Sequence, residues 1–146
     1  MSGYMNKAKR DDWGTPRNFF NELNEIWGFN LDVAASTENA LCDRFYTKED
    51  DALKHHWNLG HDGPTVVWCN PPYGRGLNDW VSKAILEWDS HHCSAIVMLL
   101  PSRTGTKWFH MLNDHPECEI RFNRGRLKFE GAEYSAPFDT ILAVFQ

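Results

Sequence analysis

The sequence lacks several features that mark common classes of protein. Its four cysteines, Cys42, Cys69, Cys93 and Cys118, form no CxxC pair, so no cysteine framework for zinc is visible. No apolar run approaches the ~20 residues of a membrane-spanning helix. The formal net charge is −5, which argues against a protein that coats DNA through a global positive field. We therefore expect a cytoplasmic protein with reduced thiols and no membrane partner.

Two histidine runs, His55-His56 and His91-His92, would offer metal ligands. Neighbouring side chains on a helix or a strand point in different directions. One ion is therefore hard to reach with both members of a pair. We predict no metal site, and a metal-dependent enzyme that uses these histidines is kept as an alternative.

The length and composition of the chain are those of one globular domain. It has 146 residues, of which 42% are hydrophobic and 14% are aromatic, including seven tryptophans. Aromatic side chains fill protein cores, and they also provide surfaces on which bases stack. Residues 1–12 are polar and are expected to form a flexible N-terminal segment. Residues 13–146 are expected to form a single domain.

The hydrophobic spacing predicts strands that alternate with helices. The expected helices cover residues 16–27, 37–45, 78–89 and 107–114, and the expected strands cover residues 29–33, 65–69, 94–100, 118–122, 126–129 and 140–145. The expected N-caps of the first three helices are Thr15, then Ser36 or Thr37, then Asn78. The first helix should bury one face that carries Phe19, Phe20, Leu23, Ile26 and Trp27. Residues 47–63 are expected to be a loop with one helical turn.

This order of elements predicts an α/β fold. Alternating strands and helices favour a mostly parallel sheet with helices on both faces. The last strands follow one another without a helix, so we expect antiparallel strands at the C-terminal end, the first two of them joined by a turn at residues 123–125. In such sheets ligands bind at the carboxyl ends of the strands. The ends that carry unusual chemistry are residues 32–36, 70–73 and 101–104, and they should share one edge.

The stretch TVVWCNPPY, residues 65–73, raises the most specific question. An apolar strand stops at Asn70, and the two prolines that follow form a stiff turn without N–H donors. The backbone carbonyls and the Asn70 side-chain oxygen remain as acceptors. Two rigid acceptors would orient the exocyclic amino group of a base, and Tyr73 would give its ring a flat surface. A base in a duplex reaches such a pocket only by rotating out of the stack.

These motifs resemble a known family. NPPY after an apolar strand is similar to the catalytic motif of the amino-group DNA methyltransferases, which use S-adenosylmethionine. The segments WGTP, LDVAAS, DDAL, LLPSRT and GRLKF extend the resemblance to the compact phage Dam-like N6-adenine methyltransferases, from about residue 12 to the C-terminus. The resemblance implies a minimal S-adenosylmethionine-dependent methyltransferase fold, which is Rossmann-like, and methylation of adenine N6 in DNA with base flipping.

The resemblance also implies a catalytic site and a cofactor site. Asn70 and the carbonyl of Pro71, followed by Pro72, would accept hydrogen bonds from the N6 amine, and Tyr73 would stack on the ring. No covalent intermediate is needed, so Cys69 beside the motif is not expected to be a nucleophile. The residues expected to bind the cofactor are Thr15, Pro16, Asp32, Ala34, Asp50, Asp51 and Asn70.

Within the cofactor site the implied roles differ. Thr15 and Pro16 would close over the methionine end, and Asp32 would hold the methionine amino group. Capping of the following helix is the alternative for Asp32. Asp51 would hydrogen-bond the cofactor adenine, with Asp50 as its rival. Residues 34–36 are Ala-Ala-Ser, where many methyltransferases have glycine because the backbone approaches the cofactor closely.

DNA recognition is expected from basic residues in loops and strand ends, since no further domain is visible for it. They are Arg75, Arg103, Lys107, Arg121, Arg124, Arg126 and Lys128. Ordinary solvated surface charge is the alternative. Two further alternatives concern function: methylation of another amine, namely cytosine N4 or a protein glutamine, and a non-catalytic DNA-binding module with a degenerate cofactor site. For the biological role, the resemblance suggests protection of phage DNA from host restriction.

Overall fold

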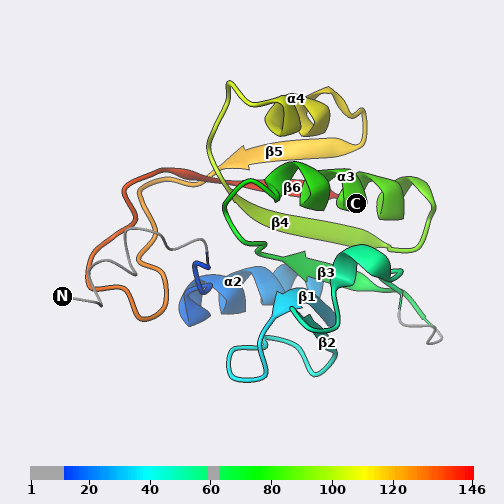
Figure 1. Ribbon diagram of the computed structural model, residues 1–146, viewed down its shortest axis with the longest axis horizontal. Helices are drawn as coiled ribbons and strands as arrows, with labels where there is room; N and C mark the ends of the chain where they lie inside the picture. Colours follow the sequence, from blue (N-terminus) through cyan, green and yellow to red (C-terminus); the bar gives the residue numbers. More distant parts are fainter. Residues whose placement is uncertain (1–11, 59–62) are drawn as a thin grey trace.

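The computed structural model describes residues 12–58 and 63–146 (Figure 1). The helices are α2 (Arg17–Trp27), α3 (Leu77–Asp89) and α4 (Lys107–Asp114), with a 3₁₀ helix η1 (Ala52–Lys54). The strands are β1 (Leu31–Ala35), β2 (Phe45–Thr47), β3 (Val66–Cys69), β4 (Ala95–Pro101), β5 (Cys118–Phe122) and β6 (Thr140–Phe145).

The strands form one six-stranded sheet in the order β2-β1-β3-β4-β6-β5. Strands β2, β1, β3 and β4 are parallel. Strand β6 lies antiparallel between β4 and β5, with Leu142 opposite Leu99 and Ala143 opposite Ile120. The predicted α/β fold, with a mostly parallel sheet and antiparallel strands at its C-terminal end, is confirmed. This arrangement is consistent with the Rossmann-like methyltransferase fold that the resemblance implied.

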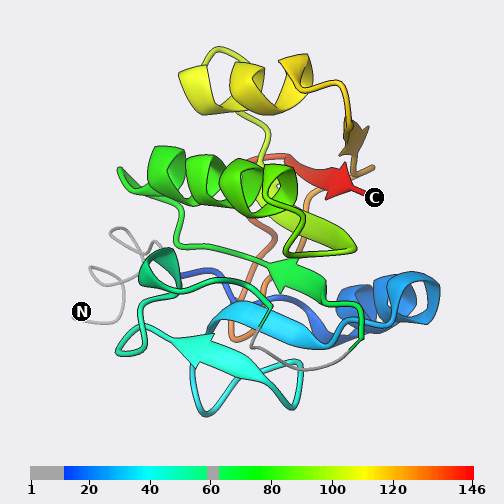
Figure 2. The ribbon, with the colours of Figure 1, turned by 90° about the vertical axis from the view of Figure 1, so that its right-hand side faces the viewer.

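Helices cover both faces of this sheet (Figure 2). Residues 145 and 146 show that helices pack on opposite faces, because successive side chains of an extended segment point to opposite faces of the sheet. Phe145 packs against Trp88 of α3, whereas the side chain of Gln146 accepts a hydrogen bond from Trp27 of α2. Strand β4 is buried along its whole length, as the apolar run of residues 94–100 predicted.

Helix α2 departs from its prediction in two details. Its N-cap is Pro16, and no side chain caps it, so the predicted cap at Thr15 is wrong. The Thr15 hydroxyl accepts a hydrogen bond from Asn70 instead. Ile26 is 69% exposed, because six positions after Phe20 turn it about 120° away from the buried face.

The helix predicted over residues 37–45 is absent. Asn39 donates its backbone N–H to the Ser36 hydroxyl, and its side chain accepts from the backbone N–H of Ser36. Local bonds of this kind compete with a helix. The Asp32 carboxyl takes the N–H of Leu41, and the chain then enters β2. The expected helical turn within residues 47–63 is confirmed as η1.

Two further predictions about local structure are wrong. Helix α3 begins after Gly76, which is an N-cap without a side-chain bond, and Asn78 lies inside the helix. Residues 126–129 form no strand; β5 pairs with β6 instead. All six residues of β6 are buried, which suits a strand with neighbours on both sides, whereas Arg126 and Lys128 are exposed. In the described part of the chain, no helix is long and apolar enough to cross a membrane.

Candidate active site

A cavity of about 960 Å³ opens at the carboxyl ends of β1 and β3. Residues from four segments line it: 12–15, 32–41, 47–53 and 68–72, together with Trp80 of α3. Its volume lies within the range of sites for small molecules and cofactors. Two of the three predicted strand ends therefore meet at one cavity. The third, residues 101–104, does not line it.

The side chain of Asn70 is held at the wall of this cavity by its amide nitrogen. The Nδ2 atom donates to the backbone carbonyl of Trp13 and, over 3.0 Å, to the hydroxyl of Thr15. A carbonyl oxygen only accepts hydrogen bonds, so the nitrogen must face Trp13. The two bonds fix which way the amide points.

The other amide atom of Asn70 has no protein partner. Its Oδ1 is one of two buried side-chain polar atoms without a hydrogen bond in the described part of the chain, the other being the indole Nε1 of Trp68. Both residues line the cavity. Because a buried polar group without a partner costs about 1–3 kcal/mol, these two atoms favour a ligand that donates to Asn70 and accepts from Trp68.

Asp32 contributes a buried carboxyl group to the wall of the cavity. Only 3% of the residue is exposed. Its Oδ1 accepts from the N–H of Ala34 and its Oδ2 from the N–H of Leu41. Burial raises the pKa of Asp32 to about 6, against the opposing effect of these two hydrogen bonds. No helix follows, so the capping alternative is wrong, and the carboxylate holds the turn that forms the rim of the cavity.

The two neighbouring aspartates are separated by the fold. Asp51 lines the cavity and caps η1 by accepting from Leu53 N–H, with a left-handed backbone at φ 58°. Asp50 does not line the cavity; its carboxylate accepts from the N–H and hydroxyl of Thr47. These hydrogen bonds lower the pKa of Asp50. The geometry therefore favours Asp51 over Asp50 as a residue that faces a bound ligand.

The remaining residues assigned to the cofactor behave differently from one another. Thr15 and Ala34 line the cavity, and Thr15 is buried. Pro16 does not line it and serves as the N-cap of α2. Ala34 belongs to β1 and follows the three buried residues that begin this strand.

Tyr73 is not presented to a ligand as its motif suggested. It is only 4% exposed, and its hydroxyl donates to the carbonyl of Leu99 over 2.9 Å. Its ring packs edge-on against Phe129 and Phe138. Burial raises its pKa well above the usual value. The predicted open stacking surface is therefore absent at Tyr73, whereas Pro71 and Pro72 of the same motif do line the cavity.

The predicted DNA-contacting residues are exposed, with one partial exception. Arg75, Arg103, Lys107, Arg124, Arg126 and Lys128 are on the surface. Arg126 lies 3.5 Å from the carboxylate of Asp139. Arg121 is half-buried: its Nε donates to Glu119 over 2.8 Å, and its guanidinium lies 5.2 Å from the centre of the Trp27 ring. Arg121 therefore has protein partners that compete with a phosphate.

Sequence reasoning missed two groups at this site. No residue pattern identifies the backbone carbonyl of Trp13, which accepts from Asn70, or the indole N–H of Trp68, which is buried without a partner. The only available signal was the high tryptophan content and the position of Trp68 two residues before Asn70.

Comparison with known proteins now identifies the family. The profile of the DNA N-6-adenine-methyltransferase (Dam) family matches residues 3–142. The chain belongs to the Dam family.

Two Dam-family relatives come from bacteriophages. The DNA N-6-adenine-methyltransferase of Escherichia phage T1 is 42% identical over 103 residues, which cover 70% of this chain and 40% of the phage protein. The DNA N-6-adenine-methyltransferase of Haemophilus phage HP1 is 30% identical over 125 residues, which cover 84% of this chain and 68% of the relative. The chain thus matches less than half of the length of the first relative and about two thirds of the second.

Proposed function

We propose that this Dam-family chain transfers a methyl group from S-adenosylmethionine to the N6 amino group of adenine in DNA. The observation that carries the proposal is the Asn70 amide. Its nitrogen is occupied by Trp13 and Thr15, while its oxygen is buried without a partner, in a residue that lines the cavity. A fixed acceptor of this kind suits an amine, which presents N–H donors.

The residues of the cavity fit S-adenosylmethionine. The cofactor supplies an electrophilic methyl group on a sulfonium centre, next to an amino acid and a nucleoside. The Asp32 carboxylate would bind the cationic amino group, and an opposite charge would offset the desolvation that raises its pKa to about 6. Asp51, on the segment of η1, would accept from the adenine of the cofactor. Both carboxyl groups line the same cavity.

The chain's contribution to the reaction is orientation. Asn70 Oδ1 would accept one N–H of the exocyclic amine and hold its nitrogen in line with the methyl group, and positioning of this kind lowers the barrier substantially. The rigid Pro71-Pro72 turn keeps that acceptor in place. Cys69 is fully buried, and burial raises its thiol pKa well above the ordinary value. It therefore stays protonated and forms no covalent intermediate.

DNA as the substrate is supported by the names of the relatives and by the exposed basic residues. An adenine in a duplex cannot reach an acceptor inside the cavity, such as Asn70 Oδ1, unless it leaves the base stack. Arg103 follows β4, and the basic residues 124–128 follow β5. We propose that these two exposed segments contact phosphates on either side of an extruded base.

The test is product identification. The chain is incubated with S-adenosylmethionine and unmethylated DNA, and the digested nucleosides are analysed by mass spectrometry. N6-methyladenine that depends on both cofactor and protein supports the proposal. N4-methylcytosine would assign the same chemistry to another base. No methylated base from a folded protein that binds S-adenosylmethionine would refute the proposal.

A further inference from the structure

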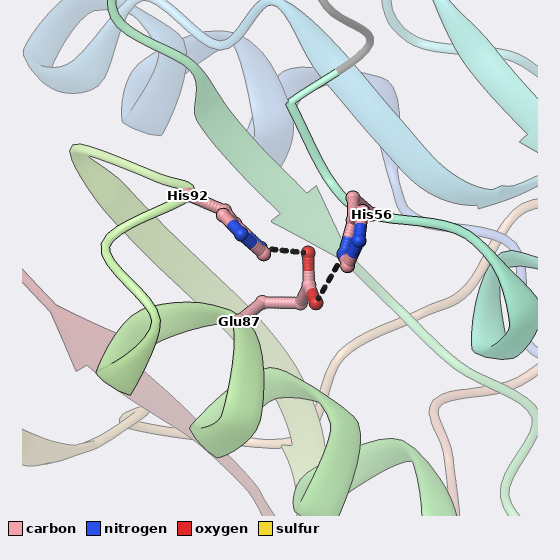
Figure 3. Close-up of side chains that lie close together, drawn as sticks. All are labelled: His56, Glu87 and His92. Atoms are coloured by element: carbon pink, nitrogen blue, oxygen red, sulfur yellow. Dashed lines mark hydrogen bonds and ion pairs between the residues drawn. The ribbon is translucent and has the colours of Figure 1, made fainter.

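A buried carboxylate outside the cofactor cavity gathers two histidines around it (Figure 3). The side chain of Glu87, on α3, is 1% exposed. The Nδ1 atom of His92 lies 3.1 Å from Glu87 Oε1, and the Nδ1 atom of His56 lies 3.4 Å from Glu87 Oε2. The three ligand-type atoms all lie within 4.8 Å of one another. None of the three residues lines the cofactor cavity.

The separations within this cluster suit a metal ion. Zinc bonds of about 2.0–2.1 Å in tetrahedral geometry place neighbouring ligand atoms about 3.3 Å apart. The two histidine nitrogens approach different oxygens of Glu87, at 3.1 and 3.4 Å, so each histidine–carboxylate separation is close to that value. Imidazole nitrogen and carboxylate oxygen are the ligands of three-residue zinc sites, in which water takes the fourth position. His56 is 69% exposed, so water has access.

The other partners of Glu87 leave room for an ion. A carboxylate offers about four lone-pair positions. The backbone N–H of Trp57 takes one on Oε1, over 2.5 Å, and the ammonium of Lys83 takes one on Oε2, over 3.1 Å. One position on each oxygen remains, and the histidine nitrogens face these. Glu87 also stands in the last turn of α3, where the helix dipole favours a cation.

The fold also removes the objection that adjacent histidines cannot share an ion. The pair at 55–56 contributes only His56, and the pair at 91–92 contributes only His92. The rings of these two lie 4.4 Å apart, centre to centre, although they come from segments separated by α3 and β3. Distance along the sequence therefore concealed a cluster that the topology assembles.

We propose that His56, His92 and Glu87 form a binding site for Zn²⁺, with water as the fourth ligand. The ion would tie the segment after η1 to the end of α3. That segment supports a wall of the cofactor cavity, because the indole of Trp57 donates to the carbonyl of Ala52, a cavity-lining residue, over 3.0 Å. The site stands apart from Asn70, so its expected effect is on stability rather than on the chemical step.

The experiment measures zinc binding directly and does not depend on methyl transfer. The full chain is treated with EDTA, freed of chelator, and titrated with Zn²⁺ by calorimetry and with Co²⁺ by absorption spectroscopy. We expect one ion per chain and a cobalt spectrum of a four- or five-coordinate site with nitrogen and oxygen ligands. Zinc at 100 times its dissociation constant should raise the folding equilibrium constant about 100-fold and raise the melting temperature accordingly.

Two matched variants separate this site from zinc bound elsewhere, for example on the free cysteines. His56→Gln removes an exposed ligand and should lower zinc affinity at least tenfold, whereas His55→Gln, next to it but outside the cluster, should bind as the wild type does. Lys83→Met should strengthen binding, because its ammonium repels a dication. Equal zinc affinity in the wild type and His56→Gln would overturn the proposal. So would the absence of zinc binding to the folded protein in a titration that detects affinities about 100 times lower than those of typical structural sites.

Discussion

Replacement of Thr15 by valine tests how the Asn70 amide is oriented. Valine keeps the shape of threonine but removes the hydroxyl that accepts from Asn70 Nδ2 over 3.0 Å. The carbonyl of Trp13 then remains as the single acceptor for that nitrogen. A hydrogen bond of this kind contributes about 1 kcal/mol net, which corresponds to roughly fivefold in the population of the correctly oriented amide. We expect kcat for methyl transfer to fall about fivefold.

Thr15→Ser is the matched control, because it restores the hydroxyl and loses only a methyl group. It should keep nearly the wild-type kcat, and both variants should melt within a few degrees of the wild type. Single-turnover rates at saturating S-adenosylmethionine separate orientation from cofactor affinity, since Thr15 also lines the cavity. A loss of rate in Thr15→Ser but not in Thr15→Val would show that the methyl group matters and the hydroxyl does not. An unchanged rate in Thr15→Val would refute the orienting role.

Three further predictions concern charge. The pKa of Asp32 is raised to about 6, so the protein without cofactor should lose stability as the pH rises from about 4 to about 6. Its affinity for the cationic cofactor should instead rise through pH 6 and be about tenfold weaker at pH 5 than at pH 7.5. Asp32→Asn should remove this pH dependence of the cofactor dissociation constant. Asp51→Asn should weaken cofactor binding in a calorimetric titration, and Asp50→Asn, which lies outside the cavity, should not. Arg124→Ala should reduce the salt dependence of DNA binding by about one phosphate contact; Arg121→Ala, whose guanidinium has protein partners, should change it less, and the opposite ranking would contradict the assignment.

The buried strands and the NPPY turn could be predicted from local patterns. The run at 94–100 is apolar on both faces, which only a covered central strand explains, and the prolines at 71 and 72 end β3 in any context. The placement of Asn70 and Asp32 at one cavity followed from the rule that parallel strands share a carboxyl edge. This much of the site required no knowledge of contacts between distant residues.

The remaining features depend on such contacts. Residues 37–45 have a helical pattern, but the Asp32 carboxyl and the Ser36–Asn39 bonds hold them in a turn. Tyr73 was expected to stack on a base because it follows the Asn-Pro-Pro turn of the NPPY motif, yet its ring packs beside Phe129 and Phe138. Strand β6, and not residues 126–129, is the partner of β5, because β6 pairs with β4 on one edge and with β5 on the other. Tertiary packing decides each of these cases.

The central claim is that Asn70 Oδ1 holds the reacting amine, and the single-turnover rate of Asn70→Ala tests it most directly. The rate is measured at saturating S-adenosylmethionine and DNA, beside the wild type, with the melting temperatures of both. Loss of one fixed hydrogen-bonding group at a reacting centre costs about 100-fold or more, so we predict at least that decrease with the fold retained. A folded Asn70→Ala variant that forms N6-methyladenine at close to the wild-type rate would contradict the account.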